Sequence, residues 1–122
     1  MANLINWFEI PAEDINRAVE FYKKILGSDL QQQEMNGIKM AFFPMEGEGV
    51  GGSLCQGEGY VPSQNSALLY LNGGEDLSEP LSKVESAGGK IIMEKSKISD
   101  EIGFMAVFID SEGNRMAFHS PK

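Results

Sequence analysis

Apolar and polar residues repeat with a helical period in the segment that follows Pro11. The apolar side chains recur at intervals of three and four residues, which places them on one face of a helix over residues 13–27. Acidic residues stand at its start and lysines near its end, as the helix dipole prefers, and Gly27 supplies a C-terminal stop. The predicted buried stripe is Ile15, Ala18, Val19, Tyr22, Ile25 and Leu26.

Short runs rich in β-branched and aromatic residues surround this helix, each bounded by Gly, Pro or Asn. The dipeptide Asn36-Gly37 between two such runs is typical of a tight β-hairpin. A polar, Gly-rich connection over residues 57–65 then leads into the second half of the chain. The predicted strands of the first half are residues 4–10, 30–35, 38–43 and 49–56.

The second half repeats the order of the first. Its helix, residues 76–87, places Leu77, Leu81 and Val84 on a buried stripe, and it tolerates Pro80 only in the first turn. Its predicted strands are residues 67–71, 90–93, 104–109 and 115–119. The pattern predicts one α+β domain over residues 1–122, built from two βαβββ modules of about residues 1–57 and 65–122.

Composition narrows the function classes. The formal charge is −8 and Lys23-Lys24 is the only adjacent basic pair, so a nucleic-acid surface is disfavoured and a neutral or cationic ligand is weakly favoured. One cysteine, Cys55, forms no internal disulfide and suits a reducing compartment. No signal peptide and no membrane-spanning run of about 20 apolar residues is visible. We therefore expect a cytoplasmic protein without a membrane partner.

Three stretches resemble the vicinal oxygen chelate superfamily, which includes glyoxalase I, extradiol dioxygenases and bleomycin-resistance proteins. They are EIPAEDINRAVEFYKKILG (9–27), VESAGGKII (84–92) and FIDSEGNRMAFHS (108–120). The resemblance implies two βαβββ modules whose sheets curl around a pocket, often in dimers. It says little about activity, because this fold hosts lyases, dioxygenases, epimerases and pure binders.

In enzymes of this superfamily, His, Gln or Glu residues at four strand positions hold a divalent metal. Matching the resemblance residue by residue places Trp7 (or Asn6, with a one-residue bulge), Ser53, Ser66 and Ala117 at these positions. Indole and methyl groups offer the metal no lone pair, and neutral hydroxyl groups are poor ligands alone. We therefore expect neither a bound metal nor another cofactor.

Side chains alternate between the two faces of a strand, which separates candidate pocket residues from core residues. If Phe8 and Ile10 face the helices, Trp7 and Glu9 face the pocket. An aromatic plate beside a carboxylate suits a small organic ligand, and a partly desolvated Glu9 would act as a base. The competing interpretation places Trp7 in the core or a dimer interface and pairs Glu9 with a cation.

The only histidine, His119, shares a strand face with Arg115 and Ala117, at the rim of the expected cavity. It is either a ligand-contacting group or a solvated residue near the C-terminus. Cys55 shares a face with Ser53 and is favoured as structural, since no base is visible beside it. Tyr70 is either a pocket residue or core. The predicted ligand-binding residues are Trp7, Glu9, Ser53, Cys55, Tyr70 and His119.

Residues 47–52 match the pattern G-x-G-x-x-G, which binds dinucleotides when it connects a strand to a helix. Strand-like residues follow it here, so a flexible turn is favoured. The leading functional hypothesis is a metal-free protein that binds a small, largely apolar molecule in the cavity between its sheets. The alternatives are a lyase or isomerase using Glu9 or His119 as general base, and a dimerisation domain without a ligand. We also expect a homodimer, because duplicated modules leave sheet faces and edges that need cover.

Overall fold

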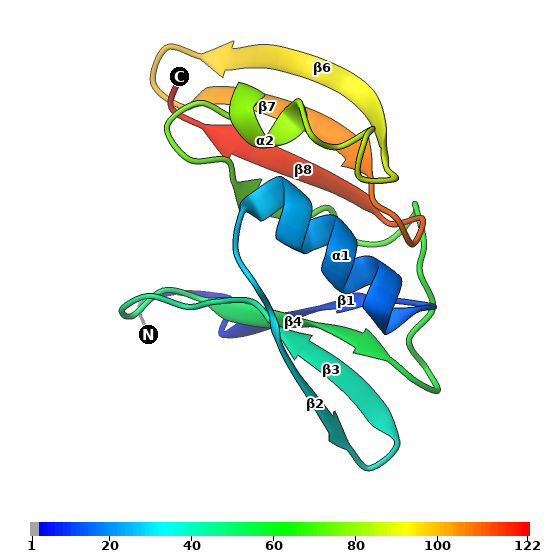
Figure 1. Ribbon diagram of the computed structural model, residues 1–122. Helices are drawn as coiled ribbons and strands as arrows, with labels where there is room; N and C mark the ends of the chain where they lie inside the picture. Colours follow the sequence, from blue (N-terminus) through cyan, green and yellow to red (C-terminus); the bar gives the residue numbers. More distant parts are fainter. Residues whose placement is uncertain (1–2) are drawn as a thin grey trace.

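The chain folds into two modules with the same arrangement of strands. A computed structural model describes residues 3–122 (Figure 1). Each module forms one four-stranded mixed sheet in which the first strand pairs in parallel with the fourth. The strand orders are β1-β4-β3-β2 in sheet A and β5-β8-β7-β6 in sheet B. The α+β fold class with two βαβββ modules is therefore confirmed.

Module 1 follows the sequence prediction closely. Asp14 caps the first helix by accepting hydrogen bonds from the backbone N–H groups of Asn16 and Arg17, and Gly27 ends it at φ 73°. Asn36 and Gly37 both have positive φ, as the predicted hairpin requires. The elements are β1 (Trp7–Pro11), α1 (Ile15–Leu26), β2 (Gln31–Met35), β3 (Ile38–Phe42) and β4 (Gly51–Gln56).

Module 2 has the predicted order with different lengths. Its elements are β5 (Tyr70–Asn72), α2 (Ser78–Leu81), β6 (Lys90–Ser99), β7 (Gly103–Ile109) and β8 (Arg115–Ser120). No helix within residues 3–122 is long and apolar enough to cross a membrane.

The second predicted helix, residues 76–87, is too long. Pro80 lies near its start as expected, but it has no N–H group to continue the helical pattern. Beyond it, Lys83 donates to the carbonyl of Pro80 and Val84 to that of Leu81, which are the bonds of tighter turns. The predicted stripe of Leu77, Leu81 and Val84 is nevertheless buried.

The predicted strand over residues 90–93 is too short, because β6 continues to Ser99. Its pairing with β7 shifts register three times, after Ile91, after Met93 and after Lys97. Each shift breaks the strict alternation of apolar and polar residues that marks a strand in sequence. The extended backbone therefore leaves no regular sequence pattern.

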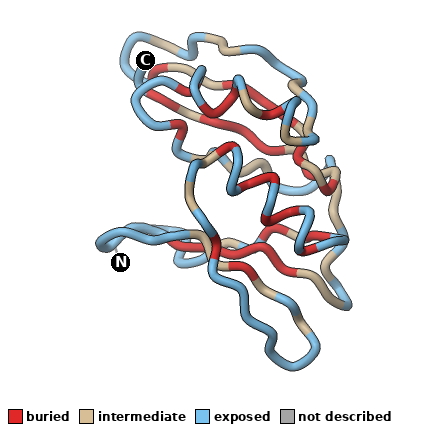
Figure 2. The backbone as a smooth tube through the Cα atoms, viewed as in Figure 1, coloured by how far each residue is buried: buried red, intermediate tan, exposed pale blue. Residues whose placement is uncertain are grey.

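Both sheets turn their helix-covered faces toward one shared core (Figures 1 and 2). The α1 helix lies between them. The Tyr22 ring packs edge-on against that of Phe43 of module 1, with ring centroids 5.5 Å apart, and the ring centroids of Phe21 and Phe108 of β7 are 6.2 Å apart. Phe21 is buried although it falls outside the predicted stripe, because α1 contacts two sheets. Because the core fills the space between the covered faces, the two open faces do not face each other.

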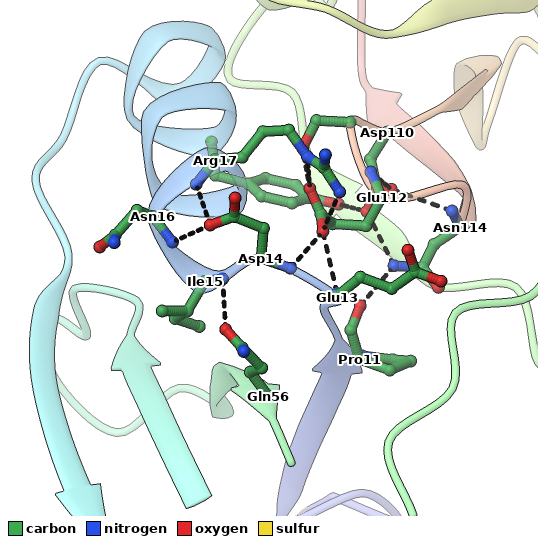
Figure 3. A network of polar contacts seen from close by, with 12 residues as sticks. Pro11, Glu13, Asp14, Ile15, Asn16, Arg17, Gln56, Asp110, Glu112 and Asn114 are labelled. Atoms are coloured by element: carbon green, nitrogen blue, oxygen red, sulfur yellow. Dashed lines mark hydrogen bonds and ion pairs between the residues drawn. The ribbon is translucent and has the colours of Figure 1, made fainter. Parts of the chain in front are cut away.

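A carboxylate from module 2 holds the start of α1 (Figure 3). Glu112, in the turn between β7 and β8, accepts hydrogen bonds of 2.9 Å from the backbone N–H groups of Glu13 and Asp14. The Arg17 guanidinium donates to both carboxylate oxygens, at 2.7 and 3.0 Å. Burial alone would raise the pKa of Glu112, but the Arg17 and backbone hydrogen bonds outweigh it and lower that pKa.

Asp110 and Asn114 extend this network into the core. The Tyr22 hydroxyl donates to Asp110 at 2.5 Å, and burial beside this carboxylate raises the pKa of Tyr22 well above its usual value. The Asn114 amide donates to the Pro11 carbonyl at 2.8 Å, which joins the end of β1 to the start of β8. The two modules are therefore fixed to each other by buried hydrogen bonds as well as apolar packing.

Candidate functional site

The predicted alternation in β1 is observed. Phe8 and Ile10 face the helical side, whereas Trp7 and Glu9 lie on the open face of sheet A opposite Gly51 and Ser53 of β4. A side chain at Gly51 would come within 2.9 Å of the Trp7 ring, so this glycine makes room for the indole. The Trp7 ring packs on that of Phe42, with ring centroids 6.0 Å apart, and Trp7 remains 44% exposed.

A cavity of about 350 Å³ lies beside β1 at the seam between the modules. β1 is an edge strand, so the cavity contacts side chains from both of its faces. Its other walls come from residues 61–69 and from the start of β8. The lining is mainly apolar and includes Trp7 and Val61. Its polar and charged residues are Glu9, Ser66, Asn114 and Arg115.

Tyr60 orients the carboxylate of Glu9. This tyrosine lies in the Gly-rich connection after β4 and donates a hydrogen bond of 2.8 Å to Glu9 Oε1. That bond raises the pKa of Tyr60 to about 12, so the phenol stays protonated as a donor at neutral pH. Tyr60 had no role predicted from sequence, although an aromatic residue in a polar connection is a visible signal.

Ser53 and Cys55 lie on the same open face but are fully buried. Their Oγ and Sγ atoms are 3.3 Å apart, within sheet A. Burial raises the pKa of the Cys55 thiol, which disfavours the thiolate that nucleophilic chemistry requires. Cys55 therefore supports the sheet, in line with the structural interpretation of its sequence position.

Tyr70 and His119 line a different, shallower groove on sheet B, together with Ile98 and Ile102. His119 Nε2 lies 2.6 Å from the Ile102 carbonyl oxygen, which only accepts, so Nε2 carries the proton. Along β8, His119 is four residues beyond Arg115, or about 13 Å at strand spacing. The structure thus brings Trp7 and Glu9 together in one cavity and places Tyr70 and His119 in another.

Arg115 lines the cavity, although sequence reasoning gave it no role. Alternation placed it on the face of β8 that carries Ala117 and His119, and the structure puts it in the wall of the cavity that contains Trp7. The signal was its isolation from other basic residues, directly after Gly113-Asn114.

The residues at the family's metal positions do not fit a divalent cation. Trp7 and Ser53 lie on sheet A and Ala117 on sheet B, while Ser66 precedes β5. An indole ring, a methyl group and two hydroxyl groups make a poor donor set. Within residues 3–122, no three His, Cys, Asp or Glu side chains gather closely enough to hold a metal ion.

Paired βαβββ modules with a mainly apolar cavity at their seam define a class of α+β proteins built on a duplicated module. The chain belongs to the Glyoxalase/Bleomycin resistance protein/Dioxygenase superfamily, whose family model matches residues 4–118. It is also 29% identical over 121 residues to a glyoxylase-like domain-containing protein of Didymella fabae, covering 93% of this chain and 90% of that protein. The family resemblance of the sequence is thereby confirmed.

Solved structures share the fold at low sequence identity. A glyoxylase/bleomycin resistance protein/dioxygenase domain from Frankia sp. EAN1pec superposes with a TM-score of 0.75 at 12% identity, with both chains fully covered. Glyoxalase I from Zea mays superposes with a TM-score of 0.70 at 17% identity, over 94% of this chain. This chain spans only 43% of the maize protein's length.

Proposed function

We propose that this protein binds a small, largely apolar molecule in the cavity beside β1, without help from a divalent metal. The cavity carries the proposal: its volume of about 350 Å³ suits one small molecule, and its walls are mainly apolar with a few polar groups. The unsuitable donor set at the family's metal positions supports binding that does not depend on metal. The homodimer expected from the sequence stays a prediction.

Trp7 offers a direct test, because it lines the cavity and is the only tryptophan of the chain. The neutral probe 3-phenylpropanol is titrated while indole emission is followed, with excitation at wavelengths that phenyl rings do not absorb. We expect saturable binding at about millimolar concentration, as is usual for a probe of this size. Adding a chelator should leave the affinity unchanged.

A cavity-filling variant locates the site. Ser66 lines the cavity and its side chain is exposed, so Ser66→Tyr should occupy the space and weaken binding at least about tenfold. Ser86→Tyr adds the same ring to an exposed position of module 2 outside this cavity and should bind like the wild type. No saturable signal, equal binding by both variants, or loss of binding with the chelator would each refute the proposal.

The Glu9–Tyr60 pair supports a second candidate, a lyase or isomerase with Glu9 as general base. One oxygen of Glu9 accepts from Tyr60, and the carboxylate borders the cavity. His119 fits this role less well, because it lies in the other groove with Nε2 bound to Ile102. Turnover of any substrate should then fall in Glu9→Gln and persist in His119→Ala, whereas turnover lost only in His119→Ala would contradict the assignment.

A further inference from the structure

Two charged side chains of opposite sign line the cavity beside β1. Glu9 comes from module 1 and Arg115 from module 2, and the remaining lining residues are neutral. The other arginine of the chain, Arg17, is paired with Glu112. Within residues 3–122, no carboxylate forms an ion pair with Arg115 or hydrogen-bonds to its guanidinium, and Glu9 has no cationic partner.

Hydrogen bonds fix the Glu9 carboxylate and the backbone that carries Arg115 before any ligand arrives. Asn114, next to Arg115, donates to the Pro11 carbonyl at 2.8 Å and accepts from the Ser63 backbone N–H at 3.1 Å. The start of β8 is thereby held against the end of β1, two residues beyond Glu9. Tyr60 holds Glu9 from the other side. Glu9 therefore loses little freedom on binding, and the guanidinium of Arg115, which has no carboxylate partner among residues 3–122, is free to meet a ligand.

The charge pattern selects the ligand. A guanidinium binds a carboxylate through two parallel hydrogen bonds, and the exposed carboxylate of Glu9 is matched by an ammonium group. A simple anion would be repelled by Glu9 and by the net charge of −8, and a simple cation by Arg115. A zwitterion satisfies both side chains and carries no net charge into the protein's field.

The geometry points to a small zwitterion as the ligand, one that carries a carboxylate at Arg115, an ammonium group at Glu9 and an apolar group against Trp7. This inference rests on the proposed binding function and names the ligand class for the same cavity. A free amino acid and a dipeptide share this chemistry and differ in the spacing of the two charges.

The test uses compounds that differ only in their charges, with Trp7 emission as the readout. L-Phenylalanine carries both charges, N-acetyl-L-phenylalanine only the carboxylate, L-phenylalaninamide only the ammonium group, and N-acetyl-L-phenylalaninamide neither. L-Alanyl-L-phenylalanine separates the charges further. We expect one of the two zwitterions to bind at least about tenfold more tightly than the three blocked compounds, and the tighter one identifies the spacing.

Variants assign each charge to its residue. Arg115→Met should weaken the preferred zwitterion about tenfold and strengthen the binding of L-phenylalaninamide, which it no longer repels. Glu9→Gln should weaken the zwitterion and strengthen the binding of N-acetyl-L-phenylalanine for the same reason. Lys39→Met removes a positive charge from β3, outside this cavity, and should match the wild type, which controls for net charge. Arg115→Lys keeps the charge and serves as a second variant if Arg115→Met folds poorly, as checked by circular dichroism.

The outcomes separate this inference from the function on which it rests. If the blocked compounds and 3-phenylpropanol bind as tightly as the zwitterions, and the variants change nothing, zwitterion recognition is refuted while small-molecule binding stands. Dependence on only one of the two charges also refutes it. If no compound binds, including 3-phenylpropanol, the binding function itself fails.

Discussion

Modules 1 and 2 share one strand order, yet their helices differ in length, in capping and in the sheets that they contact. The α1 helix has 12 residues, a side-chain cap at Asp14 and a left-handed glycine at its end, while α2 has four residues and no side-chain cap. Moreover, α1 packs on both sheets, and the backbone N–H groups of Glu13 and Asp14, just before the helix, bond to Glu112 of module 2. A duplicated fold therefore need not divide its structural roles equally.

Module 1 depends on module 2 more than module 2 depends on module 1. Module 2 supplies a carboxylate to the helix of module 1, while α2 is held mainly within its own module, for example by Ser120 Oγ accepting from the Leu77 N–H at 2.9 Å. Module 1 should therefore suffer more when the contact between modules is damaged. The following substitutions test this asymmetry, from the largest expected effect to the smallest.

Glu112→Ala should lower the free energy of unfolding by about 3 kcal/mol. The change leaves the backbone N–H groups of Glu13 and Asp14 and the Arg17 guanidinium without their acceptor. Urea unfolding followed by circular dichroism measures the loss, and hydrogen exchange should accelerate more at the amides of α1 than at those of α2. The matched control Glu79→Ala, an exposed partner of Lys83, should change stability little. Equal losses in the two variants would contradict the asymmetry.

The glycines that follow the two helical segments should respond unequally to alanine. Gly27 has φ 73°, near the left-handed region open to other residues, whereas Gly88 has φ 109°, outside it. An added Cβ meets no atom within 4 Å at either site, so backbone strain alone decides. We expect losses of about 1 kcal/mol for Gly27→Ala and about 2 kcal/mol for Gly88→Ala in urea unfolding. A larger loss at Gly27 would reverse this order.

Acid should weaken the contact between the modules before it affects module 2 alone. The folded pKa of Glu112 is lowered, so its stabilisation is complete above 4.5, its ordinary value, and is lost as the pH falls through the folded value. The Lys95 hydrogen bond lowers the pKa of Asp76 to about 2, so the stabilisation by this pair lasts to lower pH. Both side chains are partly exposed, and solvent screening makes this contribution the smaller of the two. The free energy of unfolding should therefore change less with pH in Glu112→Gln than in Asp76→Asn. The opposite order would refute the larger role of Glu112.

Much of the fold could be predicted from the sequence, because local sequence signals agree with the tertiary structure. The stripe from Ile15 to Ile25, the Gly27 stop and the Asn36-Gly37 turn each act over a few residues, and each is observed. The length of α2 was overestimated, because the effect of Pro80 depends on the turns after it. The length of β6 was underestimated, because its bulges hide the alternation.

The candidate site was only partly predictable for a different reason. Alternation assigned Trp7 and Glu9 to the correct strand face, since that rule is local. Which residues share a cavity depends instead on how the two modules pack. Ser53 and Cys55 are buried within sheet A, and His119 lies in a different groove from Glu9. Tyr60 reaches Glu9 from the connecting segment, and Arg115 enters the cavity from module 2. No spacing within one strand encodes these distances.

The buried bonds from Glu112 and Asn114 to module 1 also bear on the connectivity of the chain. They join the modules through side chains more than 90 residues apart in sequence, not through the connecting segment. The segment between β4 and β5 therefore acts as a tether that raises the local concentration of one module near the other. We therefore expect two separately produced fragments, cut within that tether, to recognise each other and reassemble.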